Sequence, residues 1–392
     1  MITKTGYWKA NEAPAHHIHS PKLSRWICDF LKEHKDKHTI DFGCGMGHYL
    51  RDLHLDSYSN LLGVEGDPPY TDYPFKIITQ DISVPFSLGR TGNVICLEVG
   101  EHIPKEFQDN FIDNITKHCD DYLIMSWALH NQGGDGHVNE LDNHVVIAEI
   151  EKRGFTYLEE FSVSARNSVE DFCCYFRNTI MIFKKNPKVT FTITSCNRLD
   201  LLKQTIDSFD KNNTYPIDQW IMTDDSFDEN IAKELDELYG SRFTIIHNNP
   251  KIGLCKSLDL LFNSSNNEYI FHCEDDWLFE VPGFIETSLK ILESNKDVHQ
   301  VWVRHKNETA NKYEEDGTIK SWDSGHWKGF TFNPGLRRKS DYLKMFKHGF
   351  TRLGSEIECS IHANTFNYKA VSIKNTSCKH IGNGRHTTNW ID

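Results

Sequence analysis

Short segments rich in β-branched residues alternate with amphipathic helical segments along the whole chain, and this alternation constrains the fold more than any other feature. In the first half, candidate strands cover residues 38–42, 60–65, 75–79, 93–98 and 121–127. Strands that alternate with helices form a mainly parallel sheet with helices on both faces. Two further apolar runs, 155–163 and 173–184, are joined by a polar loop, so we expect an antiparallel hairpin at one edge of the sheet.

The alternation begins again after a polar segment, 184–188, that contains Pro187. Further strands cover 189–194, 220–223, 243–247 and 268–272, and helices begin at 199, 229 and 254. A single hydrophobic core rarely extends over a chain of 392 residues. The predicted fold class is therefore α/β, with one domain over residues 1–186 and a second over 187–392.

The charge balance narrows the range of partners. The chain has 43 Lys and Arg residues against 56 Asp and Glu residues, so its net charge is −13. Proteins that bind nucleic acids neutralise phosphates with a basic surface, so we expect no nucleic-acid partner. We find neither an apolar signal segment at the N-terminus nor a run of about 20 apolar residues. We therefore expect no membrane span and a cytoplasmic location.

A glycine-rich loop follows the first predicted strand. It reads D-F-G-C-G-M-G over residues 41–47, with Gly43, Gly45 and Gly47 at alternate positions. Glycines at this spacing let the backbone turn tightly and approach a ligand closely. The next strand ends at Glu65, where a carboxylate can accept hydrogen bonds from both hydroxyls of a ribose. This half of the chain is therefore predicted to bind a nucleoside.

Two more acids lie at the same predicted edge. Asp81 either meets the exocyclic amine of an adenine or only caps the turn that follows it. The fourth strand ends in E-V-G-E-H-I-P over residues 98–104, and Glu98 is either a cofactor ligand or a solvated strand end. The D-x-G-x-G-x-G spacing together with these acids resembles class I S-adenosylmethionine-dependent methyltransferases over residues 20–185. A nicotinamide-dependent dehydrogenase is the alternative.

The resemblance implies a Rossmann-like sheet of seven strands with S-adenosylmethionine as cofactor. It places Asp41, Gly43 and Gly45 at the methionine moiety, Glu65 at the ribose and Asp81 at the adenine. An acceptor hydroxyl would gain from a general base with a pKa near neutrality. The candidate bases are His137, in the loop G-G-D-G-H-V-N, and His102. No metal-ligand cluster stands out in this half, so we expect methylation without a metal.

Acidic and polar residues also follow the strands of the second half. The first strand runs into S-C-N-R, so Ser195, Asn197 and Arg198 form a polar turn whose amides can meet a nucleotide. The second strand ends in Asp224 and Asp225, and a later helix carries Lys256. The fourth strand ends in three consecutive acids, Glu274, Asp275 and Asp276. Crowded carboxylates favour a bound Mn²⁺ or Mg²⁺, which prefers such oxygens and can bridge to a diphosphate.

This order of motifs resembles GT-A glycosyltransferases of the family 2 type over residues 187–392. The resemblance implies a nucleotide-sugar donor, a sugar or glycan acceptor, and a nucleotide held by Asp224 or Asp225 with Lys256 and Asp275 nearby. Glu274 and Asp276 would be the outer members of a D-x-D metal motif, although the first is Glu rather than Asp. A late histidine, His380, would complete the metal site.

The resemblance also places a carboxylate base near residues 354–358. Residues two apart on a helix point in different directions, so only one of Glu356 and Glu358 can serve, and we favour Glu358. Nearby aromatic residues either stack on a sugar or belong to the core: Trp322, His326, Trp327, Phe330 and Phe332. A Q-x-x-R-W motif is absent, which favours transfer of a single sugar over processive synthesis.

The sequence as a whole predicts a bifunctional enzyme of glycan biosynthesis. It would methylate a sugar hydroxyl and transfer one sugar by a metal-dependent, inverting mechanism. Two alternatives stay open: the methyl acceptor is not a glycan, or one domain is a degenerate module that recruits substrate for the other.

Overall fold

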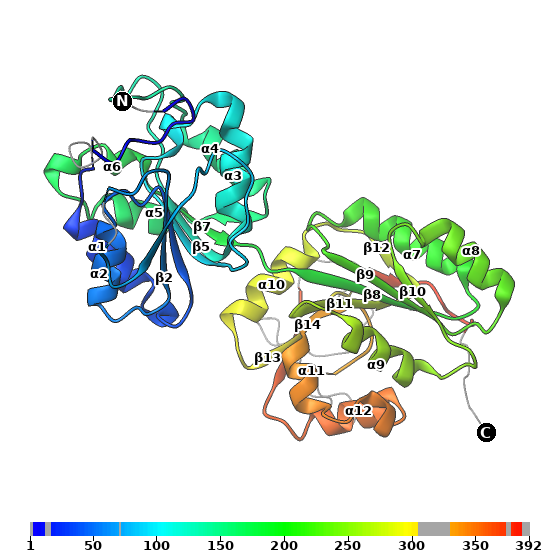
Figure 1. The fold of residues 1–392 in the computed structure, drawn as a ribbon. Helices are drawn as coiled ribbons and strands as arrows, with labels where there is room; N and C mark the ends of the chain where they lie inside the picture. The colour runs from blue at the N-terminus through cyan, green and yellow to red at the C-terminus, as the bar shows by residue number, and fades with distance from the viewer. Residues whose placement is uncertain (1–2, 12–16, 70–71, 305–329, 374–377, 386–392) are drawn as a thin grey trace. The chain divides into compact units, whose positions relative to one another are not determined.

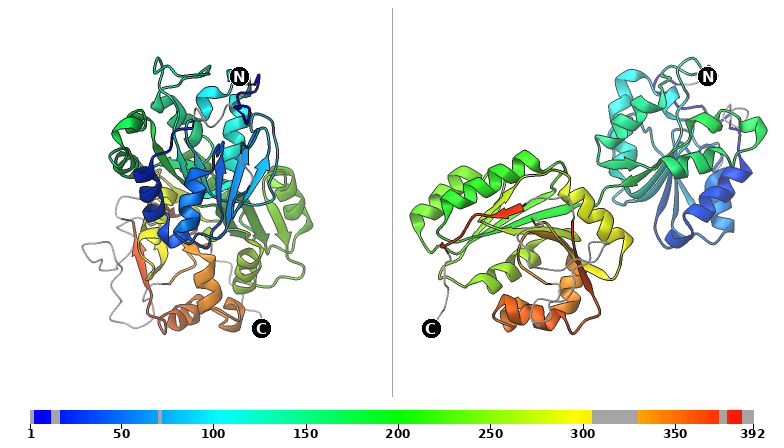
Figure 2. Two further views of the ribbon diagram at one scale, coloured as in Figure 1. Left: turned by 60° about the vertical axis from the view of Figure 1, so that its left-hand side comes forward. Right: turned by 180° about the vertical axis from the view of Figure 1, so that it is seen from behind.

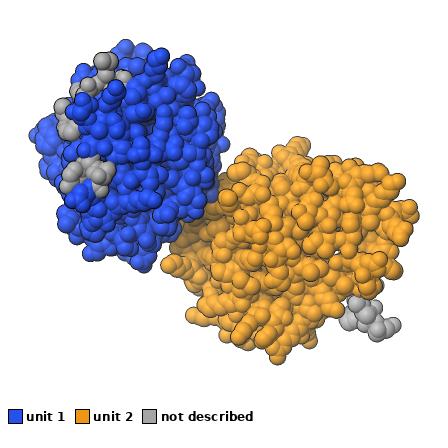
Figure 3. Space-filling model, viewed as in Figure 1, with its two compact units in different colours: residues 1–186 blue, residues 187–392 orange. Residues whose placement is uncertain are grey.

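The computed structural model describes residues 3–11, 17–69, 72–304, 330–373 and 378–385. The chain divides into two compact units, Met1–Asn186 and Pro187–Asp392, coloured separately in Figure 3. Within the described residues, no helix has both the length and the apolar character needed to cross a membrane. The aromatic residues Trp322, His326 and Trp327 lie outside the described residues.

The first unit is built on a twisted sheet (Figure 1). The sheet has seven strands in the order β3-β2-β1-β4-β5-β7-β6. Its first five strands are parallel, and β7 pairs antiparallel with both β5 and β6. The strands are β1 (Thr39–Phe42), β2 (Leu61–Glu65), β3 (Lys76–Thr79), β4 (Gly92–Cys96), β5 (Cys119–Met125), β6 (Phe155–Tyr157) and β7 (Met181–Lys185). The predicted seven-stranded sheet with an antiparallel edge is therefore confirmed.

Helices cover both faces of this sheet, as the views in Figure 2 show. One core lies under α3 (Gln108–Lys117) and α4 (Asn143–Glu151), whose buried side chains pack on Phe42 and Val94. The other core lies under α1 (Pro21–Phe30), α2 (His48–Leu55), α5 (Glu159–Arg166) and α6 (Phe176–Thr179). Strands β1, β2 and β4 are buried along their whole length, as is usual for parallel strands covered on both faces.

The predicted edge hairpin is right in its pairing and wrong in its extent. The apolar run 155–163 forms a strand only over Phe155–Tyr157, and its remainder begins helix α5. Likewise, only the end of the run 173–184 is a strand, and helix α6 precedes it. Short apolar runs do not distinguish a buried strand from one face of a helix, which explains the error.

The second unit has its own seven-stranded sheet in the order β10-β9-β8-β11-β14-β13-β15. Strands β8 to β11 are parallel, and β14 runs antiparallel between β11 and β13. The strands are β8 (Val189–Ser195), β9 (Gln219–Asp224), β10 (Thr244–His247), β11 (Tyr269–Glu274), β13 (Val298–Trp302), β14 (Gly335–Arg338) and β15 (Lys369–Ser372). The predicted α/β class of this half is confirmed.

Two helical layers enclose this second sheet (Figures 1 and 2). One core gathers side chains from α7 (Leu199–Asn212), α8 (Glu229–Tyr239) and α10 (Phe284–Ser294). The other gathers side chains from α9 (Leu254–Ser264), α11 (Lys339–Met345) and α12 (Glu356–Ala363), and it includes Phe330 and Phe332. These two aromatic residues are therefore core residues. A separate two-stranded sheet pairs β12 (Trp277–Phe279) with β16 (Cys378–His380).

Candidate active sites

The glycine loop of the first unit lies at the carboxyl end of β1 and lines a cavity of about 440 Å³. Gly43 and Gly45 have φ angles of +71° and +51°, in the left-handed region that favours glycine. A Cβ atom on Gly43 would lie 2.5 Å from a methyl carbon of Val99, and one on Gly45 would clash with the His17 ring. Gly47 caps the start of α2. The chain can therefore make this turn beside Val99 and His17 only because Gly43 and Gly45 have no side chains.

Glu65 connects the end of β2 to this loop. Its two carboxylate oxygens accept hydrogen bonds from the backbone amides of Gly45 and Gly66, each at 2.8 Å. The side chain lines the cavity, and burial raises its pKa. Each carboxylate oxygen has a second lone pair, so Glu65 can hold the loop and still accept hydrogen bonds from a ligand.

Asp41 lies beneath the same cavity and is 3% exposed. Its Oδ2 atom has no hydrogen-bond partner. Burial, and secondarily the charge of Glu65, raises the pKa of Asp41 to about 8. A buried carboxyl without a partner is costly in its ionised form, and a bound cation would relieve that cost.

The two remaining acids of this edge also line the cavity. Asp81 caps the following turn by accepting hydrogen bonds from the Ser83 amide at 2.9 Å and the Ser83 hydroxyl at 2.6 Å. Glu98 has a φ of +53°, and its Oε1 atom is buried without a partner. Glu98 is therefore not a solvated strand end. A non-glycine residue held at positive φ is strained, and such strain is concentrated at functional sites.

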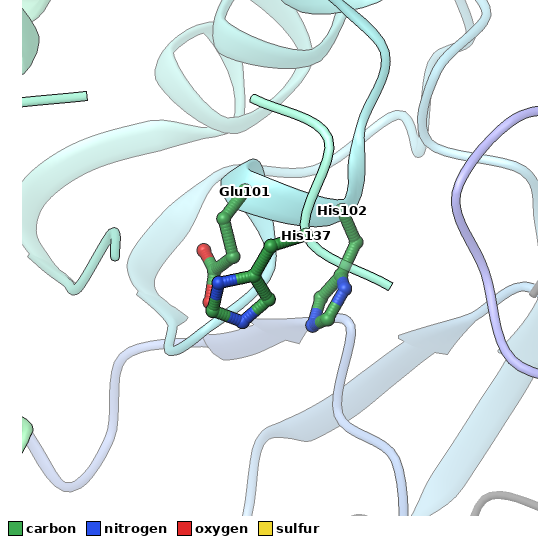
Figure 4. Close-up of side chains that lie close together, drawn as sticks. All are labelled: Glu101, His102 and His137. Carbon is green, nitrogen blue, oxygen red and sulfur yellow. The ribbon is translucent and has the colours of Figure 1, made fainter. Parts of the chain in front are cut away.

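A cluster of three side chains occupies another wall of this cavity (Figure 4). One potential ligand atom from each of Glu101, His102 and His137 lies within 4.8 Å of the other two. Glu101 is fully buried, neither of its carboxylate oxygens has a hydrogen-bond partner, and burial and the charge of Glu98 raise its pKa. The expectation that this half holds no metal-ligand cluster is therefore wrong.

Glu101 belongs to the E-V-G-E-H-I-P motif, but the sequence predicts no role for this residue. The signal that could have found it was the adjacent Glu-His pair at 101–102. The third member, His137, comes from a loop 35 residues later in the chain, and only the fold brings it to the pair.

Three acids follow each other at the end of β11 in the second unit. Asp275 and Asp276 are buried, and Arg198 forms ion pairs with both, at 2.6 Å to Asp276 Oδ2. Burial, and then the charge of Glu356, raises the pKa of Glu274 to about 8. Burial would also raise the pKa of Asp276, but the hydrogen bond with His380 and the charge of Arg198 outweigh it, so that pKa is lowered. The polar turn after β8 thus supplies the counter-ion of the acidic cluster.

These acids face a cavity of about 1070 Å³. The Nε2 atom of His380 lies 3.2 Å from Asp276 Oδ2, because β16 pairs with β12 and sets His380 opposite Trp277. The other oxygen of Asp276, Oδ1, is buried and has no partner. Glu274 and His380 line the same cavity. Glu274, Asp276 and His380 together offer two carboxylates and an imidazole, a donor set that suits a divalent cation such as Mn²⁺.

The structure separates the two candidate nucleotide acids. Asp225 lines the cavity and accepts hydrogen bonds from the amides of Ile252 and Gly253 at 2.9 and 3.0 Å, which holds the loop before α9. Asp224 instead contacts His247 at 3.0 Å and is not among the described residues that line the cavity. Ser195 and Lys256, two of the predicted nucleotide-binding residues, line the cavity. Asn197, a third, is not among the described lining residues.

The two candidate bases also separate. Glu356 is the first residue of α12 and lines the cavity, where its Oε1 atom accepts hydrogen bonds from the Thr331 hydroxyl at 2.7 Å and the Phe332 amide at 2.8 Å. Glu358 is exposed and is not among the described lining residues. Of the two candidates, Glu356 rather than the favoured Glu358 therefore lines the cavity, and the role of base stays a prediction. Arg304 and Asn333 also line the cavity, and no sequence signal identified them.

Comparisons with known proteins found one matching family model and several similar structures. Residues 190–356 match the model of glycosyl transferase family 2. Among solved structures, a similar one is the mannosyltransferase PcManGT from Pyrobaculum calidifontis in complex with GDP-Man and Mn²⁺, at 16% identity and a TM-score of 0.41. The match covers 51% of this chain and 58% of that protein. The residues that match the family model lie within the second unit.

Two other structures are similar to the chain at 16% identity. Magnesium protoporphyrin IX methyltransferase (ChlM) from Synechocystis PCC 6803 with bound SAH has a TM-score of 0.33, and the match covers 42% of this chain and 83% of that one. The methyltransferase domain of bacterial CtHen1-C has a TM-score of 0.32, with coverage of 42% and 98%. No match was found among the curated proteins.

Proposed function

We propose that the chain is a bifunctional transferase of glycan biosynthesis. The first unit transfers a methyl group from S-adenosylmethionine to a sugar hydroxyl, and the second transfers one sugar from a nucleotide-sugar donor with inversion. One observation supports both assignments. In each unit, a buried carboxylate oxygen without a partner lies at the carboxyl ends of the parallel strands, facing a cavity: Asp41 Oδ2 in the first and Asp276 Oδ1 in the second.

The cavity of the first unit fits S-adenosylmethionine by charge and by polarity. The cofactor carries an ammonium group, and its sulfonium supplies an electrophilic methyl group. Asp41 would pair with that ammonium group, Glu65 would accept hydrogen bonds from the ribose, and Asp81 would face the adenine. Methyl transfer is an in-line displacement, so the main task of these residues is to hold the cofactor in one orientation.

The cavity of the second unit fits a nucleoside diphosphate held with a divalent cation. Glu274, Asp276 and His380 would hold the cation, Mn²⁺ or Mg²⁺, which supplies positive charge beside the leaving diphosphate. Asp225, Lys256 and the amides near Ser195 would bind the nucleotide. Glu356 would accept the proton of the acceptor hydroxyl, whose oxygen attacks the anomeric carbon from the face opposite the diphosphate. Inversion of configuration follows from this single displacement.

The test uses the full chain with S-adenosylhomocysteine and a panel of nucleotide sugars, each with and without Mn²⁺. Asp276→Asn should abolish metal-dependent donor hydrolysis and leave the binding of S-adenosylhomocysteine intact. Asp41→Ala should show the reverse. If donor hydrolysis survives Asp276→Asn, the proposed metal site is wrong. If labelled methyl groups enter other acceptors but never a sugar, the link to glycans is wrong.

A further inference from the structure

We propose that Glu101, His102 and His137 bind a first-row divalent metal ion in the cofactor cavity of the first unit, and that this ion binds the acceptor hydroxyl during methyl transfer. The three side chains point toward one another from two segments of the chain (Figure 4). Their potential ligand atoms lie within 4.8 Å of one another. That spacing lets one ion contact all three after small side-chain movements, because metal–ligand distances near 2.1 Å place ligand atoms about 3–4 Å apart.

The burial of the Glu101 carboxylate is a second observation that indicates a ligand, and it does not depend on this spacing. The residue is 0% exposed, and neither of its side-chain oxygens has a hydrogen-bond partner. A second carboxylate, Glu98, lies in the same cavity with a buried oxygen that also lacks a partner. Buried carboxylates are retained in proteins when they are paired or when they coordinate a metal. Glu101, together with the one unpartnered oxygen of Glu98, lies beside two imidazoles and provides the negative charge that a cation needs.

Each of the two histidine rings has a hydrogen-bond partner outside the cluster, at its Nδ1 atom. The Nδ1 atom of His102 lies 3.2 Å from the carbonyl oxygen of Gly136, and the Nδ1 atom of His137 lies 2.9 Å from Glu140 Oε1. Metal-binding histidines usually donate a hydrogen bond from one ring nitrogen to a carbonyl or carboxylate and bind the metal through the other. With the proton on Nδ1, each ring carries its lone pair on Nε2.

Backbone hydrogen bonds hold the loop that carries His137 against Glu101. The carbonyl oxygen of Glu101 accepts hydrogen bonds from the amides of Val138 and Asn139, at 2.8 and 3.0 Å. Glu140 Oε1, which contacts His137, also accepts a hydrogen bond from the Gly133 amide at 2.7 Å. A Cβ atom on Gly134 would clash with the His137 imidazole, so the loop leaves room for the ring. The cluster is therefore held by local contacts at each member.

The donor set favours particular metals. Two imidazole nitrogens and one carboxylate suit Mn²⁺, Co²⁺ or Zn²⁺ better than Ca²⁺ or Mg²⁺, which prefer oxygen ligands alone. Three protein ligands leave coordination positions open, as catalytic metal sites do. The acceptor class that fits is an alcohol, since a metal lowers the pKa of a bound hydroxyl.

Methyl transfer to the hydroxyl requires no reactant besides S-adenosylmethionine and the acceptor. The hydroxyl loses its proton to water, its oxygen forms a bond to the methyl carbon, and the carbon–sulfur bond breaks with its electron pair staying on sulfur. The products are the methyl ether, S-adenosylhomocysteine and one proton. This step rests on the proposed methyltransferase function, whereas binding of the metal does not.

The experiment measures binding of Mn²⁺ to the full chain by electron paramagnetic resonance, with no methyl acceptor present. We expect two sites. His137→Ala and Glu101→Gln should each weaken one site at least about 10-fold and leave the other, and Asp276→Asn should remove that other site. The matched control is His144→Ala, an exposed histidine on α4, which should keep both sites. A conservative variant, Glu140→Gln, should weaken the first site while preserving the thermal unfolding of the protein.

Two outcomes overturn the inference. One is a single Mn²⁺ site that Asp276→Asn abolishes and His137→Ala leaves unchanged. The other is a second site whose loss in His137→Ala leaves methyl transfer to a hydroxyl at the wild-type rate. Binding of S-adenosylhomocysteine is measured on the same samples. If that binding is absent while the second Mn²⁺ site is present, the proposed methyltransferase function fails and the metal site stands.

Discussion

At the scale of single residues, both sites depend on acids whose ionisation the fold opposes. Asp41 is the clearest case, because burial and the charge of Glu65 raise its pKa to about 8. Its carboxyl is therefore mostly protonated at pH 7 before a ligand binds. A cationic amino group would bind the ionised form, so binding would release a proton from Asp41.

This gives a prediction with a definite sign. The affinity for S-adenosylhomocysteine should rise as the pH increases from 6 to 8, because the ionised fraction of Asp41 increases, and it should level off above pH 8. Asp41→Asn should bind more weakly and lose this pH dependence. Isothermal titration calorimetry in buffers of different ionisation enthalpy measures both the affinity and the proton release. An affinity that falls from pH 6 to 8 would contradict the assignment.

A second prediction at this scale separates the two glutamates of α12. Glu356→Gln keeps an oxygen that can accept hydrogen bonds from Thr331 and Phe332, but it removes the base. We expect the rate of sugar transfer to fall by about 10²-fold or more, with donor binding retained. The matched variant Glu358→Gln changes an exposed residue on the same helix and should transfer sugar at nearly the wild-type rate. Equal losses in both variants would contradict the assignment of Glu356.

At the scale of elements, the glycine loop after β1 shows how little space a tight turn leaves for side chains. Gly43→Ala adds a Cβ at positive φ and within 2.5 Å of Val99. We expect it to destabilise the protein by about 1–2 kcal/mol from backbone strain alone, and to weaken binding of S-adenosylhomocysteine further. Gly89→Ala is the matched control, since Gly89 has a φ of +64° and nothing within 4 Å of an added Cβ. Both variants should therefore lose stability in urea unfolding, Gly43→Ala by more because of the added contact with Val99, and only Gly43→Ala should lose affinity.

The elements also show where prediction from sequence succeeds. Parallel strands β8, β9 and β11 end side by side, with Ser195 opposite Asp224 and Thr194 opposite Glu274. The expectation that their terminal acids share one edge therefore followed from the strand order. The apolar run 155–163 failed as a strand, because its residues fit a helix face equally well and only packing against β7 and α6 decided its conformation.

At the scale of the whole molecule, each unit has hydrophobic cores of its own: Ile40 and Phe111 belong to cores of the first, and Phe191 and Phe271 to a core of the second. We therefore expect two thermal transitions in the full chain. S-Adenosylhomocysteine at about 100 times its dissociation constant should stabilise only one transition, by about 2.7 kcal/mol. A nucleotide sugar with Mn²⁺ should stabilise the other. Differential scanning calorimetry checks this, and one ligand that raises both transitions equally would show that the units unfold together.

The sequence by itself determined the α/β class, the restart of the alternation near Pro187, and the acids at the strand ends. These features are local, because a glycine loop or a run of acids consists of consecutive residues. The direction of the preceding strand then places it at the carboxyl edge of the sheet. The tertiary structure alone decided which distant residues meet these motifs. It brought His137 to Glu101 through backbone hydrogen bonds, brought His380 to Asp276 through the pairing of β16 with β12, and turned Glu356 rather than Glu358 into the cavity. Such contacts depend on how loops and helices pack, and no spacing in the sequence encodes them.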